Sequence, residues 1–150
     1  MPLPAPQELR TYFVTAVTAN RRRLFQVEAN ADLLLKTLTH YHDQGRYQIH
    51  AFVIMPDHVH VMLTPAPDVS LEKAVQYIKG GFSFRLKSKF EVWSRSFNES
   101  QILTSEKFQA CKLYIEQNPV RARLVDSAHT YSHSSAHRAN LIDPPPSHLR

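Results

Sequence analysis

The spacing of apolar residues divides the first part of the chain into a strand and a helix. Tyr12–Thr18 is rich in β-branched and aromatic residues and stops before the basic run Arg21–Arg23, which predicts a strand and then a loop. A helix is indicated next by apolar side chains at helical spacing: Leu34, Leu35, Leu38 and Tyr41. Gly45 is expected to end this helix.

The pattern continues with a hairpin, a second helix and a further strand. Tyr47–Met55 and Val59–Thr64 are separated by a Pro-Asp turn signal, so they should pair as a hairpin. Ser70 suits the N-cap of a helix with one apolar face, formed by Leu71, Val75, Ile78 and Phe82. A fourth strand is expected within Glu91–Leu103, and Ser105 should cap a last long helix.

The order βαββαβα predicts an α+β fold with an antiparallel sheet and helices on one face. On the third strand, His58 and His60 should point away from the helices, because alternate residues face opposite sides of a strand. In the last helix, Phe108, Cys111 and Ile115 should form the core stripe, with Tyr114 on the flank. Pro119 disfavours helical geometry in the residue before it and predicts a break at Asn118.

Length and composition limit the domain organisation. The chain has 150 residues, of which 43% are hydrophobic, enough for one domain with a core but too few for two. We expect a single domain over residues 1–125. From Asp126 onward Ser, His and Pro dominate, so residues 126–150 are expected to form an irregular, partly disordered tail.

Charge and cysteine content point to polyanionic partners in a reducing compartment. Eighteen Lys and Arg against thirteen Asp and Glu give a formal charge of +5. The single cysteine, Cys111, excludes an internal disulfide. The stretch Met1–Pro6 has no apolar signal region and no stretch is long enough to span a bilayer, so a cytoplasmic, nucleoid-associated protein with no membrane contact is expected.

The candidate chemistry centres on the sequence His58-Val59-His60. Two neutral imidazoles on one face of a strand can bind a divalent metal ion together with one further ligand, although such a pair alone is more often a plain polar surface. Tyr114 and Asn118 lie one helical turn apart and should point similarly. By periodicity alone, Tyr114 would be a half-buried aromatic residue and Asn118 a helix cap.

The chain resembles the REP-associated tyrosine transposases, within the larger group of single-strand DNA transposases named HUH for a His-hydrophobic-His signature. The resemblance runs from about Tyr12 to Val125. It is carried by five motifs in order: Tyr12-Phe13-Val14-Thr15, Arg21-Arg22-Arg23-Leu24-Phe25, Phe52 to His60, Ile78-Lys79-Gly80, and Tyr114-Ile115 with Asn118-Pro119-Val120. The chain departs at Arg123, where family members commonly carry glycine, and at Asn98, where many carry histidine.

The resemblance implies a ferredoxin-like βαββαβ sheet with an additional C-terminal helix that carries the tyrosine. It further implies a metal-dependent single-strand endonuclease and strand transferase that acts near DNA hairpins, such as REP-like palindromes, as a monomer or homodimer. Tyr114 would be the nucleophile and would form a 5′-phosphotyrosine, and His58, His60 and Asn118 would hold Mg²⁺ or Mn²⁺.

Candidate DNA contacts are cations that could follow phosphates: Arg21, Arg22, Arg23, Lys79, Arg85, Lys87 and Lys89. Three alternatives remain open at this point. The protein could bind nucleic acid without chemistry, it could be a metal-dependent nuclease that uses water, or His129, His133 and His137 could bind zinc in the tail.

Overall fold

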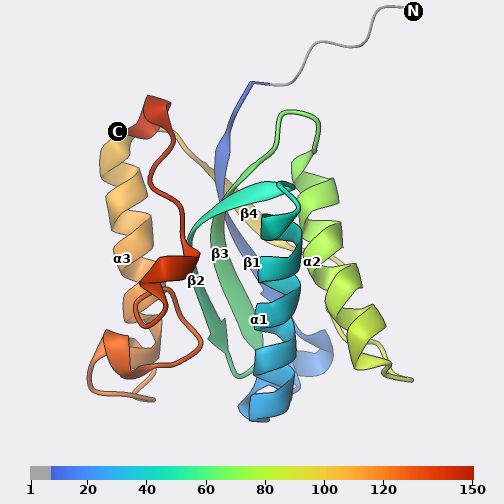
Figure 1. Cartoon of the computed structure of the whole chain (residues 1–150). Coiled ribbons are helices and arrows are strands. Elements are labelled where there is room, and N and C mark those ends of the chain that lie inside the picture. The colour runs from blue at the N-terminus through green and yellow to red at the C-terminus, as the bar shows by residue number, and fades with distance from the viewer. Residues whose placement is uncertain (1–7) are drawn as a thin grey trace, which may run out of the picture.

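A four-stranded antiparallel sheet forms the centre of the molecule (Figure 1). The computed structural model describes residues 8–150, so the stretch at residues 1–6 lies outside the described part. The strands are β1 (Thr11–Val17), β2 (Tyr47–Met55), β3 (His58–Pro65) and β4 (Asn98–Ile102), in the order β2-β3-β1-β4. The helices are α1 (Glu28–Asp43), α2 (Leu71–Leu86) and α3 (Ser105–Arg121). The predicted α+β class and the order of elements are confirmed.

Helices α1 and α2 cover one face of the sheet and enclose a large apolar core. Val59, Val61 and Leu63 of β3 point into this core, as predicted. Phe82 of α2 is fully buried there. Gly45 follows the end of α1 with φ +75°, a conformation that glycine adopts without strain, and the Ser70 hydroxyl caps α2 by accepting from the Lys73 N–H.

The opposite face is partly covered by α3 and by the C-terminal segment. Phe108, Cys111 and Ile115 of α3 pack against Val53 and Met62 of the sheet, which confirms the predicted core stripe of this helix. The expectation that all helices share one face is wrong. The helix after β4 crosses to the other side because its apolar stripe must be buried, and the first face is already filled by α1 and α2.

Two predicted boundaries of α3 differ from the structure. Thr104, not Ser105, is the N-cap, and its hydroxyl accepts from the Lys107 N–H at 3.1 Å. The predicted break at Asn118 is absent, since α3 continues through Pro119 to Arg121. A proline so close to the end of a helix removes one backbone donor, and burial of its ring offsets part of that cost.

Arg123, just after α3, has the left-handed conformation with φ +60°. This is the position where the resembled family commonly carries glycine, and glycine is the residue that adopts this conformation without steric strain. The structure therefore gives a backbone reason for the glycine that is common there.

The C-terminal segment runs along the outer edge of β2. It is irregular, with short 3₁₀ turns at Ala128–Thr130, Ala139–Leu141 and Ser147–Leu149. It differs from the expectation of partial disorder because it is bonded to the sheet: the Ile54 N–H donates to the His133 carbonyl at 2.9 Å. A Ser- and Pro-rich composition does not reveal that an open strand edge offers such a segment its hydrogen-bond partners.

At one end of the sheet, the termini of several elements lie near one another (Figure 1). There β1 ends, β3 begins at His58, and α2 ends. Backbone hydrogen bonds join Thr18 to Asp57 and Phe25 to Pro56, so the basic loop after β1 lies against the β2-β3 turn. Within residues 8–150, no helix has both the length and the apolar character needed to cross a bilayer.

Candidate active site

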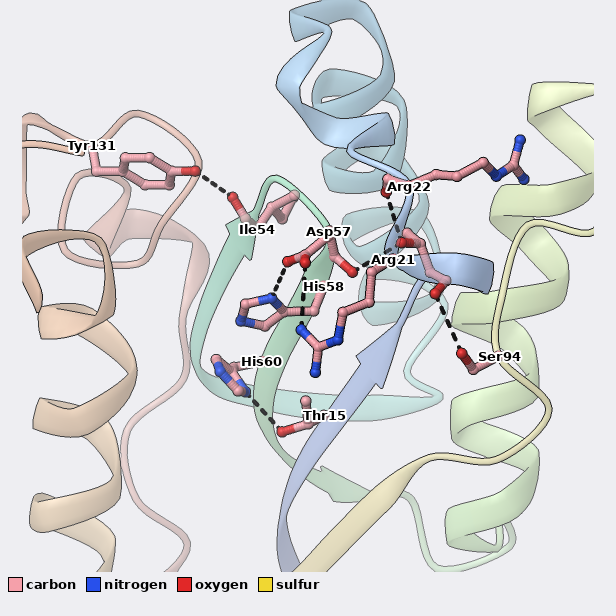
Figure 2. A network of polar contacts seen from close by, with 10 residues as sticks. Thr15, Arg21, Arg22, Ile54, Asp57, His58, His60, Ser94 and Tyr131 are labelled. Atoms are coloured by element: carbon pink, nitrogen blue, oxygen red, sulfur yellow. Dashed lines mark hydrogen bonds and ion pairs between the residues drawn. The ribbon is translucent and has the colours of Figure 1, made fainter. Parts of the chain in front are cut away.

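His58 and His60 stand side by side on β3, on the sheet face opposite α1 and α2. Their ring centroids are 4.7 Å apart. The Nδ1 of His58 lies 2.6 Å from the Asp57 carboxylate, and the Nδ1 of His60 lies 2.7 Å from the Thr15 hydroxyl (Figure 2). Since a carboxylate only accepts, His58 donates through Nδ1 and keeps its Nε2 lone pair free when neutral. Partners of this kind orient imidazoles that ligate metals.

His60 is buried and stays neutral. Burial, with smaller contributions from the nearby positive charges of His58 and Arg121, lowers the pKa of His60 to about 3. The Thr15 hydroxyl can either accept from or donate to Nδ1, and in the tautomer in which Nδ1–H donates, the Nε2 of His60 is unprotonated. The ring is thus in the form that binds a metal ion at neutral pH.

Asp57 connects the histidine pair to the basic loop. Its second carboxylate oxygen pairs with Arg21 at 3.4 Å (Figure 2). Burial acts to raise the pKa of Asp57, but the hydrogen bond with His58 and the contact with Arg21 outweigh it, and the pKa is lowered. Asp57 is therefore a carboxylate at neutral pH, and it positions the His58 ring.

Tyr114 projects from α3 toward the histidines. Its ring centroid is 6.0 Å from that of His60 and 5.8 Å from that of Phe13. The side chain is 47% exposed, so its hydroxyl can be reached from solvent. The guanidinium of Arg121 lies 4.2 Å from the centre of the same ring and donates to the Tyr114 carbonyl at 2.6 Å.

Asn118 lies one turn after Tyr114 and is partly buried. Among the described residues, no hydrogen bond joins its carboxamide to His58 or His60. The structure thus brings the predicted tyrosine to the predicted histidine pair, and helical periodicity places the amide on the same side of α3.

The predicted DNA-contact residues fall into two groups. Three of them donate to backbone carbonyls: Lys79 to Ser94 at 2.9 Å, Arg85 to Gly81 at 3.0 Å, and Arg22. Burial also lowers the pKa of Lys79. Arg22 is half-buried and donates to the Glu91 carbonyl. The exposed cations are Arg21, Arg23, Lys87 and Lys89, of which Arg21 also pairs with Asp57. Within this second group, Arg23, Lys87 and Lys89 are exposed and have no carboxylate partner among the described residues.

The three tail histidines considered as a zinc site do not converge. His133 is buried against the Asp32 carboxylate at 2.7 Å. His137 is exposed, and its Nδ1 lies 2.7 Å from the His129 carbonyl. In the described part of the chain, no three His, Cys, Asp or Glu side chains are grouped to hold a metal ion.

Four residues of this site were not identified from the sequence: Phe13, Thr15, Asp57 and Arg121. Asp57 directly precedes His58, and Arg121 follows Tyr114 by two helical turns, so both carried a local signal. Phe13 and Thr15 belong to a motif that carries the resemblance, but they had no assigned role, because only the β1-β3 pairing, which sets Thr15 opposite His60, brings them to the histidines.

Comparison with known proteins places this arrangement in a family. Residues 7–118 match the family described as "Transposase IS200 like". No curated protein gives a significant match. A solved REP-associated tyrosine transposase bound to a REP hairpin is similar in fold, with a TM-score of 0.78 and 22% identity over 100% of this chain and 93% of that one.

A second solved structure, described as a candidate transposase from Deinococcus radiodurans, has a TM-score of 0.55 and 24% identity, over 77% of this chain and 96% of that one. At these identities the structural likeness establishes the fold, and the sequence match over residues 7–118 establishes the family. The chain belongs to the IS200-like transposases.

Proposed function

We propose that this protein nicks single-stranded DNA and transfers the cut strand, with Tyr114 as the nucleophile. The observation that carries the proposal is the position of the Tyr114 ring, 6.0 Å from His60 and open to solvent, in a member of the IS200-like transposase family. The ordinary pKa of a tyrosine is about 10, so a phenol needs nearby positive charge to lose its proton readily. The guanidinium of Arg121 lies 4.2 Å from the centre of the Tyr114 ring, a position from which it can contact a phosphate.

The proposed step conserves the energy of the cleaved bond. The Tyr114 oxygen forms a bond to phosphorus, the bond from phosphorus to the 3′-oxygen breaks, and that oxygen leaves as a 3′-hydroxyl after gaining a proton. The product is a 5′-phosphotyrosine, and attack by another 3′-hydroxyl reverses the step. Rejoining therefore needs no nucleotide cofactor.

The residues present fit a divalent metal ion. His58 and His60 each use Nδ1 for a protein partner, which leaves Nε2 for a ligand, and Asn118 offers a carboxamide oxygen. Two imidazoles suit Mn²⁺ better than Mg²⁺, which prefers oxygen. When bound, such an ion supplies Lewis-acid polarisation of the scissile phosphate. The protein's own contribution is to orient both rings and to keep His60 neutral.

The proposed substrate is a single strand that carries a hairpin. The similar solved structure is described as bound to a REP hairpin. In this chain, Arg21 pairs with Asp57, the partner of His58 (Figure 2), and the exposed Arg23 follows in the same loop, so both cations can contact a phosphate backbone there. A small domain with one nucleophile is also better suited to cleaving one unpaired strand than to cleaving both strands of a duplex.

A denaturing gel tests the proposal. A labelled hairpin oligonucleotide from the protein's own genomic neighbourhood should give a covalent protein-DNA adduct with Mn²⁺, and the fully paired duplex should not. Tyr114→Phe should abolish the adduct and leave affinity nearly unchanged, whereas the matched control Tyr77→Phe should keep it.

Metal dependence is tested on the same gel. EDTA, His58→Ala and His60→Ala should each stop adduct formation, and added Mn²⁺ should rescue only the wild type treated with EDTA. Cleavage without an adduct would indicate a hydrolase that uses water, and binding without cleavage would indicate a DNA-binding module.

A further inference from the structure

An apolar groove lies directly beside Tyr114, between β4 and the first half of α3. It has a volume of about 570 Å³. The rings of Phe13 and Tyr114 form one wall, and Ile102, Leu103 and Ala110 form much of the rest. Leu103 is 72% exposed, so it adds apolar surface that a ligand can cover.

The charge of the groove suits a polyanion. Lys107 stands on its rim, Arg121 lies over the Tyr114 ring at one end, and no Asp or Glu among residues 8–150 lines it. Its polar groups, Gln101 and Thr104 among them, can donate or accept hydrogen bonds. A flat apolar molecule attached to a phosphate fits such a groove, because its apolar part can contact the apolar side chains and its phosphate can contact Lys107 or Arg121.

A second hollow, of about 350 Å³, lies further along the β1-β4 pair, toward the end of β1, and its lining is more polar. It is lined by Asn20, Arg21, Ser94, Ser96 and Asn98, by the apolar side chains of Val17 and Phe97, and by Thr15, the partner of His60. A more polar hollow that contains one cation thus follows the apolar groove along the β1-β4 pair.

We propose that the groove is a nucleobase site for the nucleotide immediately 3′ of the scissile phosphate. The inference rests on the proposed function, because it takes Tyr114 as the nucleophile. Attack in line places the leaving 3′-oxygen on the side of phosphorus away from Tyr114. The nucleotide that stays bonded to Tyr114 is therefore the 3′ one, and its base remains next to the rings of Phe13 and Tyr114, which offer a stacking surface.

Binding measurements test the groove without any chemistry. The probes are an oligothymidylate and an abasic strand of equal length, measured in EDTA against wild type, Leu103→Ala and Leu113→Ala. Leu113, on α3, is the matched control because it is exposed like Leu103 but does not line the groove. Leu103→Ala should weaken oligothymidylate binding about fivefold and leave abasic binding unchanged, while Leu113→Ala should change neither.

Adduct formation then tests the position of the base. An abasic residue on the 3′ side of the mapped scissile phosphate should slow the adduct about tenfold, the size expected when one base no longer stacks on an aromatic ring, and one on the 5′ side should slow it less. Equal effects of Leu103→Ala and Leu113→Ala would overturn the groove assignment. So would a change of oligomeric state in Leu103→Ala with DNA binding intact, which would show that a second copy of the chain covers the groove.

The two proposals fail separately. Absence of an adduct from every oligonucleotide overturns the proposed function, and the binding measurements still decide whether the groove takes a base. If the rate of adduct formation depends neither on the 3′ base nor on Leu103, only the assignment of the groove as a base site is overturned.

Discussion

The two faces of the sheet are made by the same strands but differ in what they bury. Toward α1 and α2, the sheet contributes Val, Ile, Leu and Phe side chains to a continuous apolar core. Toward α3, it buries His50, His60 and Thr64 among fewer apolar side chains. Each of these polar groups has a partner, such as His50 Nε2 with the Thr64 hydroxyl at 2.8 Å.

The main apolar core and the proposed active site thus lie on opposite faces of the sheet. On the apolar face, each side chain that is removed from water raises the free energy of unfolding. The other face needs a matched partner for each buried polar group, and leaves Tyr114 half exposed. The following four predictions test that division, in order of the expected change in the free energy of unfolding.

Phe82→Ala should cost about 3 to 5 kcal/mol of unfolding free energy, because Phe82 is fully buried and packs against Phe25 and Trp93 at ring distances of 5.3 and 5.7 Å. Chemical denaturation measures the loss. Phe13→Ala, on the other face and partly exposed, should cost clearly less while reducing adduct formation. Equal losses of stability would contradict the division between the faces.

Asp143→Ala should loosen the C-terminal segment from β2 and cost about 1.5 to 3 kcal/mol. The Asp143 carboxylate accepts from the Ile49 N–H at 2.9 Å and pairs with His42 at 2.8 Å. Hydrogen exchange should show the Ile49 and Ile54 amides losing protection. The exposed Asp126→Ala serves as the control and should leave both amides protected.

His60 should make the protein less stable in mild acid. Its pKa in the folded protein is about 3, below the ordinary value of 6.5, so between these values the unfolded chain binds a proton that the folded protein does not. The contribution of His60 to the free energy of unfolding is therefore fully present above about pH 6.5. Below that pH it falls by about 1.4 kcal/mol per pH unit. Urea unfolding from about pH 6.5 to 4.5 measures this slope, and His60→Asn should reduce it by about one proton. An unchanged slope would refute the assignment.

Replacing both Lys87 and Lys89 by Ala should change stability by less than about 0.5 kcal/mol, because both side chains are exposed. If they bind phosphates, the slope of log affinity against log salt should fall by about one unit for each phosphate that is no longer neutralised. Lys36→Ala, on α1, should leave the salt dependence of DNA binding unaltered. The same slope in all variants would remove Lys87 and Lys89 from the DNA interface.

Local patterns in the sequence predicted much of the fold. Periods of two and of 3.6 identified the strands and the buried stripes, including Phe82 in α2 and Phe108, Cys111 and Ile115 in α3. They also placed the two histidines on one face of β3. These features depend on residues within one or two turns of each other, so they can be inferred from the sequence alone.

The sequence predicted the two ends of α3 and the path of the C-terminal segment less well. Thr104 and Ser105 are both good N-caps, and the structure uses Thr104. Pro119 predicted a helix end three residues too early. In the structure α3 continues to Arg121, and the ring of Pro119 is buried in its last turn. The path of the C-terminal segment was not predictable from its Ser- and Pro-rich composition, since its hydrogen-bond partners belong to β2.

By itself, then, the sequence determined the identity of the strands and helices, the pairing of His58 with His60 on one face, and the candidate nucleophile. Only the tertiary structure decided that α3 covers that face and brings Tyr114 to His60, that Thr15 on β1 holds the His60 ring, and that an apolar groove opens beside them. The physical reason is that strand register and helix packing are set by burial and hydrogen bonding between residues far apart in the chain, which no local period encodes.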